Sequence, residues 1–147
     1  MATEKAQNQY LLRDVMTREV ETISPAAGIY EAAETMRTLN VGAIPVCDGT
    51  RLQGMITDRD IVVRIIAEKR QPDTVTVQDV MTPHVLYCYE DQDIKKAARL
   101  MEGEQIRRLP ILNREKQLVG IVSLGDVAVK THAPETAGKT LEGVSQK

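Results

Sequence analysis

Apolar and polar residues follow one another along the chain with two periods, one typical of helices and one typical of strands. Within residues 29–39 the apolar side chains recur at steps of three and four, which places them on one face of a helix. Two short apolar runs follow at 43–47 and 52–57, and Asp48-Gly49 between them is a turn signal. This succession predicts a helix followed by a pair of antiparallel strands.

The same succession of elements is expected twice. In the first half an extended piece at 20–24 precedes the helix, and a second helix at 58–68 follows the strands. The corresponding elements of the second half are expected at 85–89, 93–102, 109–112, 118–123 and 124–131. Each half therefore has the order β-α-β-β-α. The predicted fold class is α+β, with the helices of each half on one face of a small sheet.

An internal repeat accounts for this symmetry. The tetrapeptide DVMT occurs at 14–17 and again at 79–82, an offset of 65 residues. The same offset relates Pro45 to Pro110, and one extra residue in the following turn makes the later offset 66. Such self-similarity marks a duplicated unit that cannot bury its apolar face alone, so the two copies are expected to pack on each other.

The repeat also sets the expected domain boundaries. The first copy is expected at 8–70 and the second at 71–132, with the polar joint Gln71-Pro72-Asp73 between them. Residues 133–147 are expected to form a polar tail that is at most loosely docked.

Composition narrows the classes of function. The chain has 147 residues with 19 Lys and Arg against 21 Asp and Glu, and it has four Tyr but no Trp or Phe. This balance argues against a nucleic acid polymer as partner, because phosphate backbones need clustered cations and exposed bases need aromatic stacking surfaces. No apolar run is long enough to predict a membrane-spanning helix or a signal peptide. The isolated Cys47 and Cys88 fit reduced thiols, so we expect a cytoplasmic protein without a membrane partner.

A hydroxyl residue precedes a carboxylate by three positions at two strand-to-helix junctions. These pairs are Thr57 with Asp60 and Ser123 with Asp126. One interpretation is purely structural, because a hydroxyl at the N-cap and an acid at the third helical position form a capping box. The other interpretation is that the carboxylate accepts hydrogen bonds from a vicinal diol such as ribose. The spacing alone leaves both interpretations open.

Two further patterns also have a structural and a functional interpretation. Arg107 and Arg108 precede a core strand and suit a phosphate, as does Arg59 within the first junction, although solvated turns often carry such residues. The first copy has Gly42-Ala43 where the second has the two arginines, so phosphate recognition is expected to be asymmetric. The apolar pairs Ile44-Pro45 and Leu109-Pro110 form either plain core or a slot for a purine ring.

Signatures of catalysis are missing from the sequence. His84 and His132 have no partner at the spacing of a metal site or a catalytic triad, and no nucleophile elbow, zinc-protease or phosphate-loop motif occurs. We therefore expect no catalytic residue, no metal site and no catalytic cofactor, and hence a protein that is not an enzyme.

These residues together resemble a tandem pair of CBS domains, also called a Bateman module. The resemblance covers about 11–131 and depends on the two DVMT segments, the strands VGAIPV and IRRLPIL, and the Gly-x-x-Thr/Ser-x-x-Asp ends of both copies. Within that family the chain is similar to small bacterial stand-alone CBS-pair proteins. The resemblance implies two repeats related by a pseudo-twofold axis, with ligand clefts between them.

The resemblance also implies a ligand and the residues that hold it. The ligand is adenosine-containing: AMP, ADP, ATP, S-adenosylmethionine or NAD(H). Ribose is then held by the two hydroxyl–carboxylate pairs, and phosphate by Arg107, Arg108 and Arg59. The residues implied for the adenine slots are Thr22, Ile23, Ile44, Pro45, Tyr87, Cys88, Leu109 and Pro110.

The function implied is that of a regulatory sensor that acts through the ligand-dependent conformation of a homodimer, with an unidentified target protein. A helical face with Ile61, Val62, Ile65 and Ile66 is available for such a dimer. The alternative is a scaffold for protein interactions that binds no nucleotide.

Overall fold

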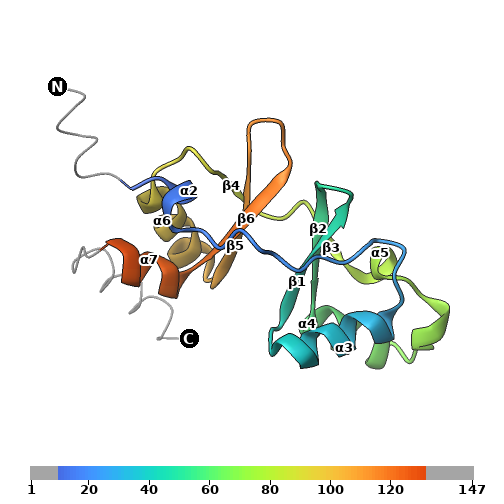
Figure 1. Cartoon of the computed structure of the whole chain (residues 1–147). Helices are drawn as coiled ribbons and strands as arrows, with labels where there is room; N and C mark the ends of the chain where they lie inside the picture. Colours follow the sequence, from blue (N-terminus) through green and yellow to red (C-terminus); the bar gives the residue numbers. More distant parts are fainter. Residues whose placement is uncertain (1–9, 132–147) are drawn as a thin grey trace, which may run out of the picture. The chain divides into compact units, whose positions relative to one another are not determined.

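The computed structural model describes residues 10–131, which form two compact units. The first-repeat unit is the continuous segment 21–85. The second-repeat unit consists of residue 86 onward together with the N-terminal segment up to residue 20 (Figure 1). Both units combine helices with a three-stranded sheet, so the α+β fold class is confirmed.

The first-repeat unit begins with the predicted amphipathic helix and hairpin and ends with short elements. Its elements in chain order are α3 (Ile29–Leu39), β1 (Ala43–Asp48), β2 (Arg51–Thr57), α4 (Asp58–Ile61), η1 (Val62–Ile66), η2 (Pro72–Thr74), α5 (Val77–Val80) and β3 (Thr82–Pro83). The antiparallel sheet has the strand order β1-β2-β3. The turn η1 is a π-helix, in which the Ala67 N–H donates to the carbonyl of Val62, five residues earlier, at 2.8 Å.

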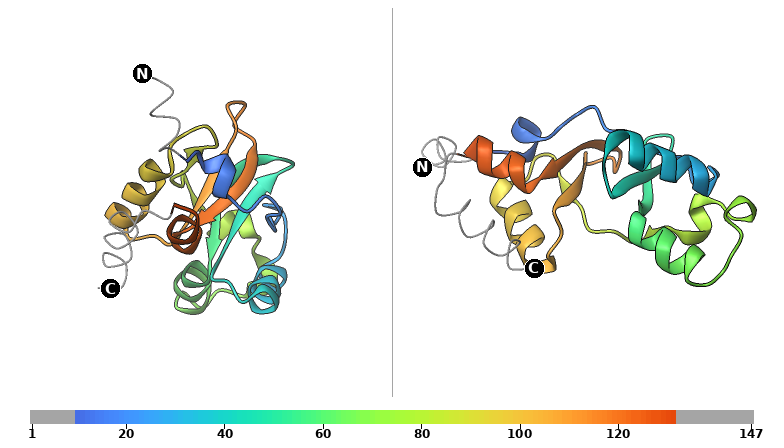
Figure 2. Two further views of the ribbon diagram at one scale, coloured as in Figure 1. Left: turned by 60° about the vertical axis from the view of Figure 1, so that its left-hand side comes forward. Right: turned by 90° about the horizontal axis from the view of Figure 1, so that it is seen from below.

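The core of this unit lies between one face of the sheet and two helices. Ile44 and Ile56 are directly opposed on β1 and β2, and both are buried. They pack with Ala32 of α3 and Ile65 of η1 in one apolar cluster. Figure 2 shows α3 and the α4–η1 segment side by side along the same sheet. Ile23 extends the sheet through a single parallel bridge to Val46.

The second-repeat unit is built on the same plan. Its elements are α2 (Leu12–Val15), β4 (Cys88–Tyr89), α6 (Ile94–Glu104), β5 (Arg108–Leu112), β6 (Leu118–Ser123) and α7 (Leu124–Thr131). The strand order is β4-β5-β6, with β4 parallel to β5 and β5 antiparallel to β6. Leu109, Val122 and Met101 are fully buried in a second apolar cluster, to which Leu12 of α2 also belongs.

Each unit is completed by the DVMT segment of the other repeat. Thr82 pairs with Met55 of β2, and at the equivalent position Thr17 pairs with Ile121 of β6. Glycines permit these close approaches: a Cβ atom on Gly54 would lie 2.5 Å from the carbonyl oxygen of Thr82, and one on Gly120 would lie 2.5 Å from a side-chain atom of Met16. The compact units differ from the expected repeats 8–70 and 71–132 in two segments, because residues 10–20 belong to the second-repeat unit and residues 71–85 to the first-repeat unit.

The remaining differences from the predicted elements are local. The helices α2 and α5 were not expected, although Thr76 and Asp79 form a capping box at the start of α5. The helix expected at 58–68 is regular only to Ile61 and ends as a π-turn at Ile66. The extended piece at 20–24 makes only the single bridge at Ile23. The tail expected at 133–147 lies outside the described residues.

Candidate functional site

The first hydroxyl–carboxylate pair, hereafter the first motif, forms a complete capping box at the start of α4. The backbone N–H of Asp60 donates to the hydroxyl of Thr57 at 3.0 Å, and the Thr57 N–H donates to Asp60 Oδ2 at 3.0 Å. This reciprocal arrangement satisfies two amide groups that the helix itself leaves without partners. The structural interpretation of the first motif is thus confirmed.

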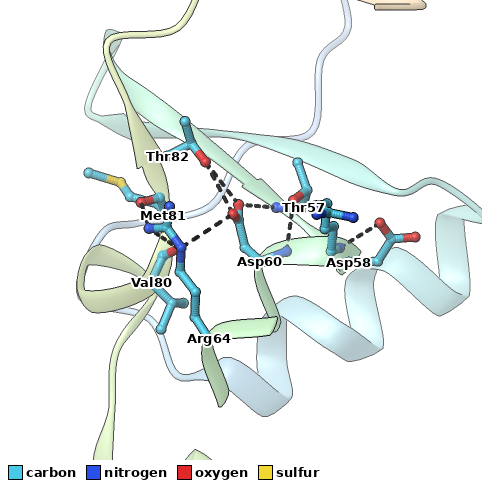
Figure 3. A network of polar contacts seen from close by, with 8 residues as sticks. Thr57, Asp58, Asp60, Arg64, Val80, Met81 and Thr82 are labelled. Carbon is cyan, nitrogen blue, oxygen red and sulfur yellow. Dashed lines mark hydrogen bonds and ion pairs between the residues drawn. The ribbon is translucent and has the colours of Figure 1, made fainter. Parts of the chain in front are cut away.

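The carboxylate of Asp60 also contacts the DVMT segment that completes its unit. The Thr82 hydroxyl donates to Asp60 Oδ1 at 3.1 Å and to Oδ2 at 3.3 Å (Figure 3). The Nε atom of Arg64 lies 3.9 Å from Oδ1. Asp60 is only 7% exposed, which makes it the one buried charged residue in the part of the chain that the structure describes. Both of its oxygens therefore already have partners.

Arg64 ties the same network to the end of α5. Its Nη1 atom lies 3.3 Å from the carbonyl oxygens of both Val80 and Met81 and donates to them (Figure 3). The carbonyls at the end of a helix have no partners within the helix, and a guanidinium is well suited to satisfy them. Thr57, Asp60, Arg64 and Thr82 thus join α4 to α5 and β3 within the first-repeat unit.

The second hydroxyl–carboxylate pair, the second motif, is also a capping box but has fewer contacts. The Ser123 N–H donates to Asp126 Oδ2 at 2.9 Å, and the Asp126 N–H donates to the Ser123 hydroxyl at 3.1 Å. Both residues are half-buried. Thr17 occupies the position equivalent to Thr82, but it is exposed. Among the side chains that the structure describes, none donates to the other oxygen of Asp126, Oδ1.

Two arginines stand at the strand edge beside the second motif, whereas the equivalent strand edge beside the first motif has none. Arg108 lies directly opposite Ser123 on the neighbouring strand, whereas Ala43 lies opposite Thr57. Residues opposed in this way have Cβ atoms about 5 Å apart, so the Arg108 guanidinium lies within reach of anything bound at Ser123. Arg107 and Arg108 are both exposed, and within residues 10–131 neither side chain forms an ion pair.

The corresponding strand edge of the first-repeat unit has an acid instead. The N–H of Asp58 donates to the carbonyl of Gly42, just as the N–H of Leu124 donates to that of Arg107. The carboxylate of Asp58 lies over Gly42, because a Cβ atom there would be 3.0 Å from Oδ2. The Arg59 side chain is exposed, and its backbone N–H donates to Asp58 Oδ1 at 2.8 Å. Two carboxylates therefore accompany the single candidate cation.

The residues implied for the adenine slots divide into accessible and buried groups. Thr22 is exposed and Tyr87 is half-buried. The others are buried, and four of them belong to the apolar cores: Ile23, Ile44, Cys88 and Leu109. Pro45 and Pro110 are buried as well. For Ile44 and Leu109 the structure shows the packing role that the sequence left as an alternative, and Ile23 and Cys88 also pack in the cores.

A partly exposed cluster of Tyr87, Tyr89, Asp91 and Arg114 near β4 was not identified from the sequence. Arg114 donates two hydrogen bonds of 2.9 Å to Asp91 and stacks 4.1 Å from the ring centre of Tyr89. The hydrogen bonds from Arg114 lower the pKa of Asp91, and Asp91 in turn raises the pKa of Arg114. Tyr87 meets Tyr89 edge to face, with ring centres 5.5 Å apart. In the sequence only the opposite charges of Asp91 and Arg114 could have indicated this cluster, and 23 residues separate the two side chains.

Within residues 10–131, no group of three or more His, Cys, Asp or Glu side chains is placed to hold a metal ion. None of the described helices is long and apolar enough to cross a membrane. The two thiols are buried, and burial raises the pKa of Cys47 to about 11. His132 lies outside the described residues.

The sequence is similar to a known protein family and to several of its members. The family model of the CBS domain matches residues 12–67 and 77–130. The CBS domain-containing protein YhcV of Bacillus subtilis is 43% identical over 136 residues, which are 92% of this chain and 96% of YhcV. Hypoxic response protein 1 of Mycobacterium tuberculosis is 37% identical over 126 residues, which are 85% of this chain and 86% of that protein.

Three solved structures are similar as well. Hypoxic Response Protein I, crystallised with two coordinated zinc ions, is 34% identical with a TM-score of 0.74, covering 82% of this chain and 98% of that one. CBSX2 in complex with AMP is 27% identical with a TM-score of 0.71, covering 82% of this chain and 94% of that one. The CBS domain pair of MJ0100, in complex with 5′-methylthioadenosine and S-adenosyl-L-methionine, is 26% identical with a TM-score of 0.70. The match covers 82% of this chain and 94% of that one.

Proposed function

This chain belongs to the CBS-domain family, and on that premise we propose that it is a regulatory module that binds an adenosine-containing ligand and catalyses no reaction. The candidate ligands are AMP, ADP, ATP, S-adenosylmethionine and NAD(H). Two of the similar structures support this proposal, because one holds AMP and the other holds two adenosine derivatives. Another similar structure was crystallised with two coordinated zinc ions, but among residues 10–131 of this chain no group of three or more His, Cys, Asp or Glu side chains is placed to hold a metal ion.

The observation that carries the proposal is the arrangement at the second motif. Asp126 is half-buried, and one of its carboxylate oxygens has no partner among the described side chains. Arg108 lies in register with Ser123, and Arg107 precedes it on the same strand edge. A carboxylate can accept from ribose hydroxyls while guanidinium groups bind phosphate oxygens. A nucleotide combines both chemistries in one small molecule.

The remaining roles follow from the same proposal. Thr57, Asp60 and Arg59 occupy the equivalent positions of the first repeat, where the family resemblance alone implies a second ribose and phosphate site. Thr22 and Tyr87 are the accessible residues available to contact a base. The module acts in the cytoplasm as a homodimer and passes the state of its ligand to a target protein. A ligand can shift the equilibrium between two conformations of such a dimer only by as much as its binding free energies for the two conformations differ.

A ligand-independent scaffold is the second candidate, and an exposed apolar surface favours it. Val62 and Ile66 on η1 are 56% and 61% exposed, and Tyr30 on α3 is 62% exposed. Ile65, which the sequence placed on the same face, is instead part of the core. Val62 and Ile66 lie on one helical segment, and exposed apolar side chains grouped in this way are typical of protein interaction sites. The same surface also serves a homodimer.

A thermal-shift assay separates the two candidates. The protein is melted alone and with AMP, ADP, ATP, S-adenosylmethionine and NADH. A ligand at a hundredfold excess over its Kd adds about 2.7 kcal/mol to the stability of the native state, which raises the melting temperature measurably. Asp126→Ala is expected to remove the shift. If none of the five ligands shifts the wild-type melting curve, the sensor proposal fails and the scaffold is favoured.

A further inference from the structure

The carboxylates of the two motifs have different hydrogen-bond partners. We propose that the second motif binds the ligand and that the first motif does not. In this proposal, which rests on the proposed function above, Ser123 and Asp126 with Arg107 and Arg108 bind one phosphate-bearing adenosine ligand per chain. Thr57 and Asp60 form a structural joint that holds α5 and β3 in place.

The acceptor capacity of Asp60 is the first argument. A ribose bound through its two hydroxyl groups needs open positions on a carboxylate. The Oδ2 atom of Asp60 already accepts from the Thr57 N–H and the Thr82 hydroxyl, while Oδ1 accepts from Thr82 and faces Arg64. Asp60 is also 7% exposed. A ribose hydroxyl would compete with Thr82 for these buried oxygens, and loss of the Thr82 hydrogen bond would remove a contact that attaches β3 to the rest of its unit.

Asp126 presents the opposite situation. Its Oδ2 atom caps the helix, and no described side chain donates to Oδ1. Thr17, the counterpart of Thr82, is exposed, whereas Thr82 is half-buried. The second motif can therefore accept from a ribose hydroxyl without losing any contact that the structure shows.

Charge at the neighbouring strand edge is the second, independent argument. Beside the second motif this edge has Arg107 and Arg108, and the first residue of the following helix is Leu124. Beside the first motif it has Gly42 and Ala43, and the first helical residue is Asp58, whose carboxylate lies over Gly42. Guanidinium groups attract a phosphate, and a carboxylate in the same place repels it. The two motifs thus differ in the ligand they tolerate as well as in accessibility.

Isothermal titration calorimetry of the full chain with ADP, and separately with adenosine, tests this division. We expect one ADP per chain in the wild type and no detectable ADP binding by Asp126→Ala. Asp60→Asn keeps the shape of the joint and is expected to bind one ADP with a Kd within threefold of the wild type. Circular dichroism spectra establish that each variant is folded.

Removing the arginines tests the phosphate assignment. Arg107→Ala combined with Arg108→Ala is expected to weaken ADP at least tenfold and adenosine less than threefold. Lys95→Ala combined with Arg99→Ala is the matched control, because it removes the same charge from exposed positions on α6 of the same unit. The control variant is expected to bind ADP and adenosine with affinities within twofold of the wild type.

The outcomes distinguish this inference from the proposed function. Two ADP molecules per chain, or loss of binding in Asp60→Asn with retention in Asp126→Ala, would overturn the inference while leaving the sensor function intact. Equal weakening of ADP and adenosine by the double arginine variant would overturn the phosphate assignment. If neither ADP nor adenosine binds, and none of the other ligands shifts the melting curve, the proposed function fails and the inference fails with it.

Discussion

Replacing the aspartate of each motif by alanine tests how much each carboxylate contributes to the stability of the fold. Asp60→Ala removes the acceptor for the Thr57 N–H, the acceptor for the Thr82 hydroxyl and the anion beside Arg64. Asp126→Ala removes only the acceptor for the Ser123 N–H among the described contacts. The two substitutions delete the same atoms at equivalent positions of the repeat, so each is a control for the other.

The expected magnitudes follow from these contacts. Loss of the hydrogen bond that the aspartate contributes to the capping box costs about 1 kcal/mol at either position. At Asp60, loss of the buried hydrogen bond from Thr82 adds about 1 kcal/mol, and the groups left without a partner add about another. The ion pair with Arg64 contributes less than about 0.5 kcal/mol, because that side chain is 45% exposed and the distance is 3.9 Å. We therefore expect a loss of about 3 kcal/mol for Asp60→Ala and about 1 kcal/mol for Asp126→Ala.

Melting curves without ligand measure the difference. A chain of this size loses about 2–4 °C per kcal/mol, so Asp60→Ala is expected to melt about 6–12 °C below the wild type and Asp126→Ala about 2–4 °C below it. A double-mutant cycle with Thr82→Ala should show a coupling energy of about 1 kcal/mol between Asp60 and Thr82. Equal losses for the two aspartates, or additive effects of the Asp60 and Thr82 substitutions, would refute the reasoning.

Three further predictions concern close packing and pH. Gly54→Ala is expected to cost about 1–3 kcal/mol, because its Cβ would meet a backbone oxygen at 2.5 Å, whereas Gly103→Ala, inside α6 with nothing within 4 Å, should cause no loss in the same melting assay. Cys47, whose pKa burial raises from 9.0 to about 11, contributes stability that is complete below pH 9 and is lost as the pH rises toward 11; denaturant titrations should show this decline, and a Cys47→Ala variant should lack it. Asp79 has a pKa lowered from 3.8, chiefly because the Thr76 N–H donates to it, so its contribution is present above that pH and is lost as the pH falls below it. Asp79→Asn should therefore be less sensitive than the wild type to acid, and equal acid sensitivity would contradict this assignment.

Elements with a strong local pattern could be predicted from the sequence to the residue. The helices at 29–39 and 124–131 and the strand at 118–123 have the predicted bounds. In α3 the apolar positions are separated by helical steps, and in β6 the strand ends where the capping box begins, so local information suffices in both cases. The pairs Thr57–Asp60 and Ser123–Asp126 were likewise placed correctly at strand-to-helix junctions.

The partners of Asp60 could not be predicted in this way. Thr82 lies 22 residues further along the chain, and the contact exists only because β3 pairs with β2. The sequence gives Thr17 the same motif position, yet Thr17 is exposed. The short helices α2 and α5 were missed for a related reason, because four residues carry too little periodicity and their burial depends on the other repeat.

The exchange of the DVMT segments has a consequence for how this chain can be divided. Scission between residues 70 and 71 would leave α2 on a fragment that lacks α6, β5 and β6, and would leave α5 and β3 on a fragment that lacks β2. Each fragment would then carry an element whose packing partners belong to the other. Two half-genes made by this cut are therefore expected to complement each other only when they are expressed together, and each product on its own is left with an unfinished core.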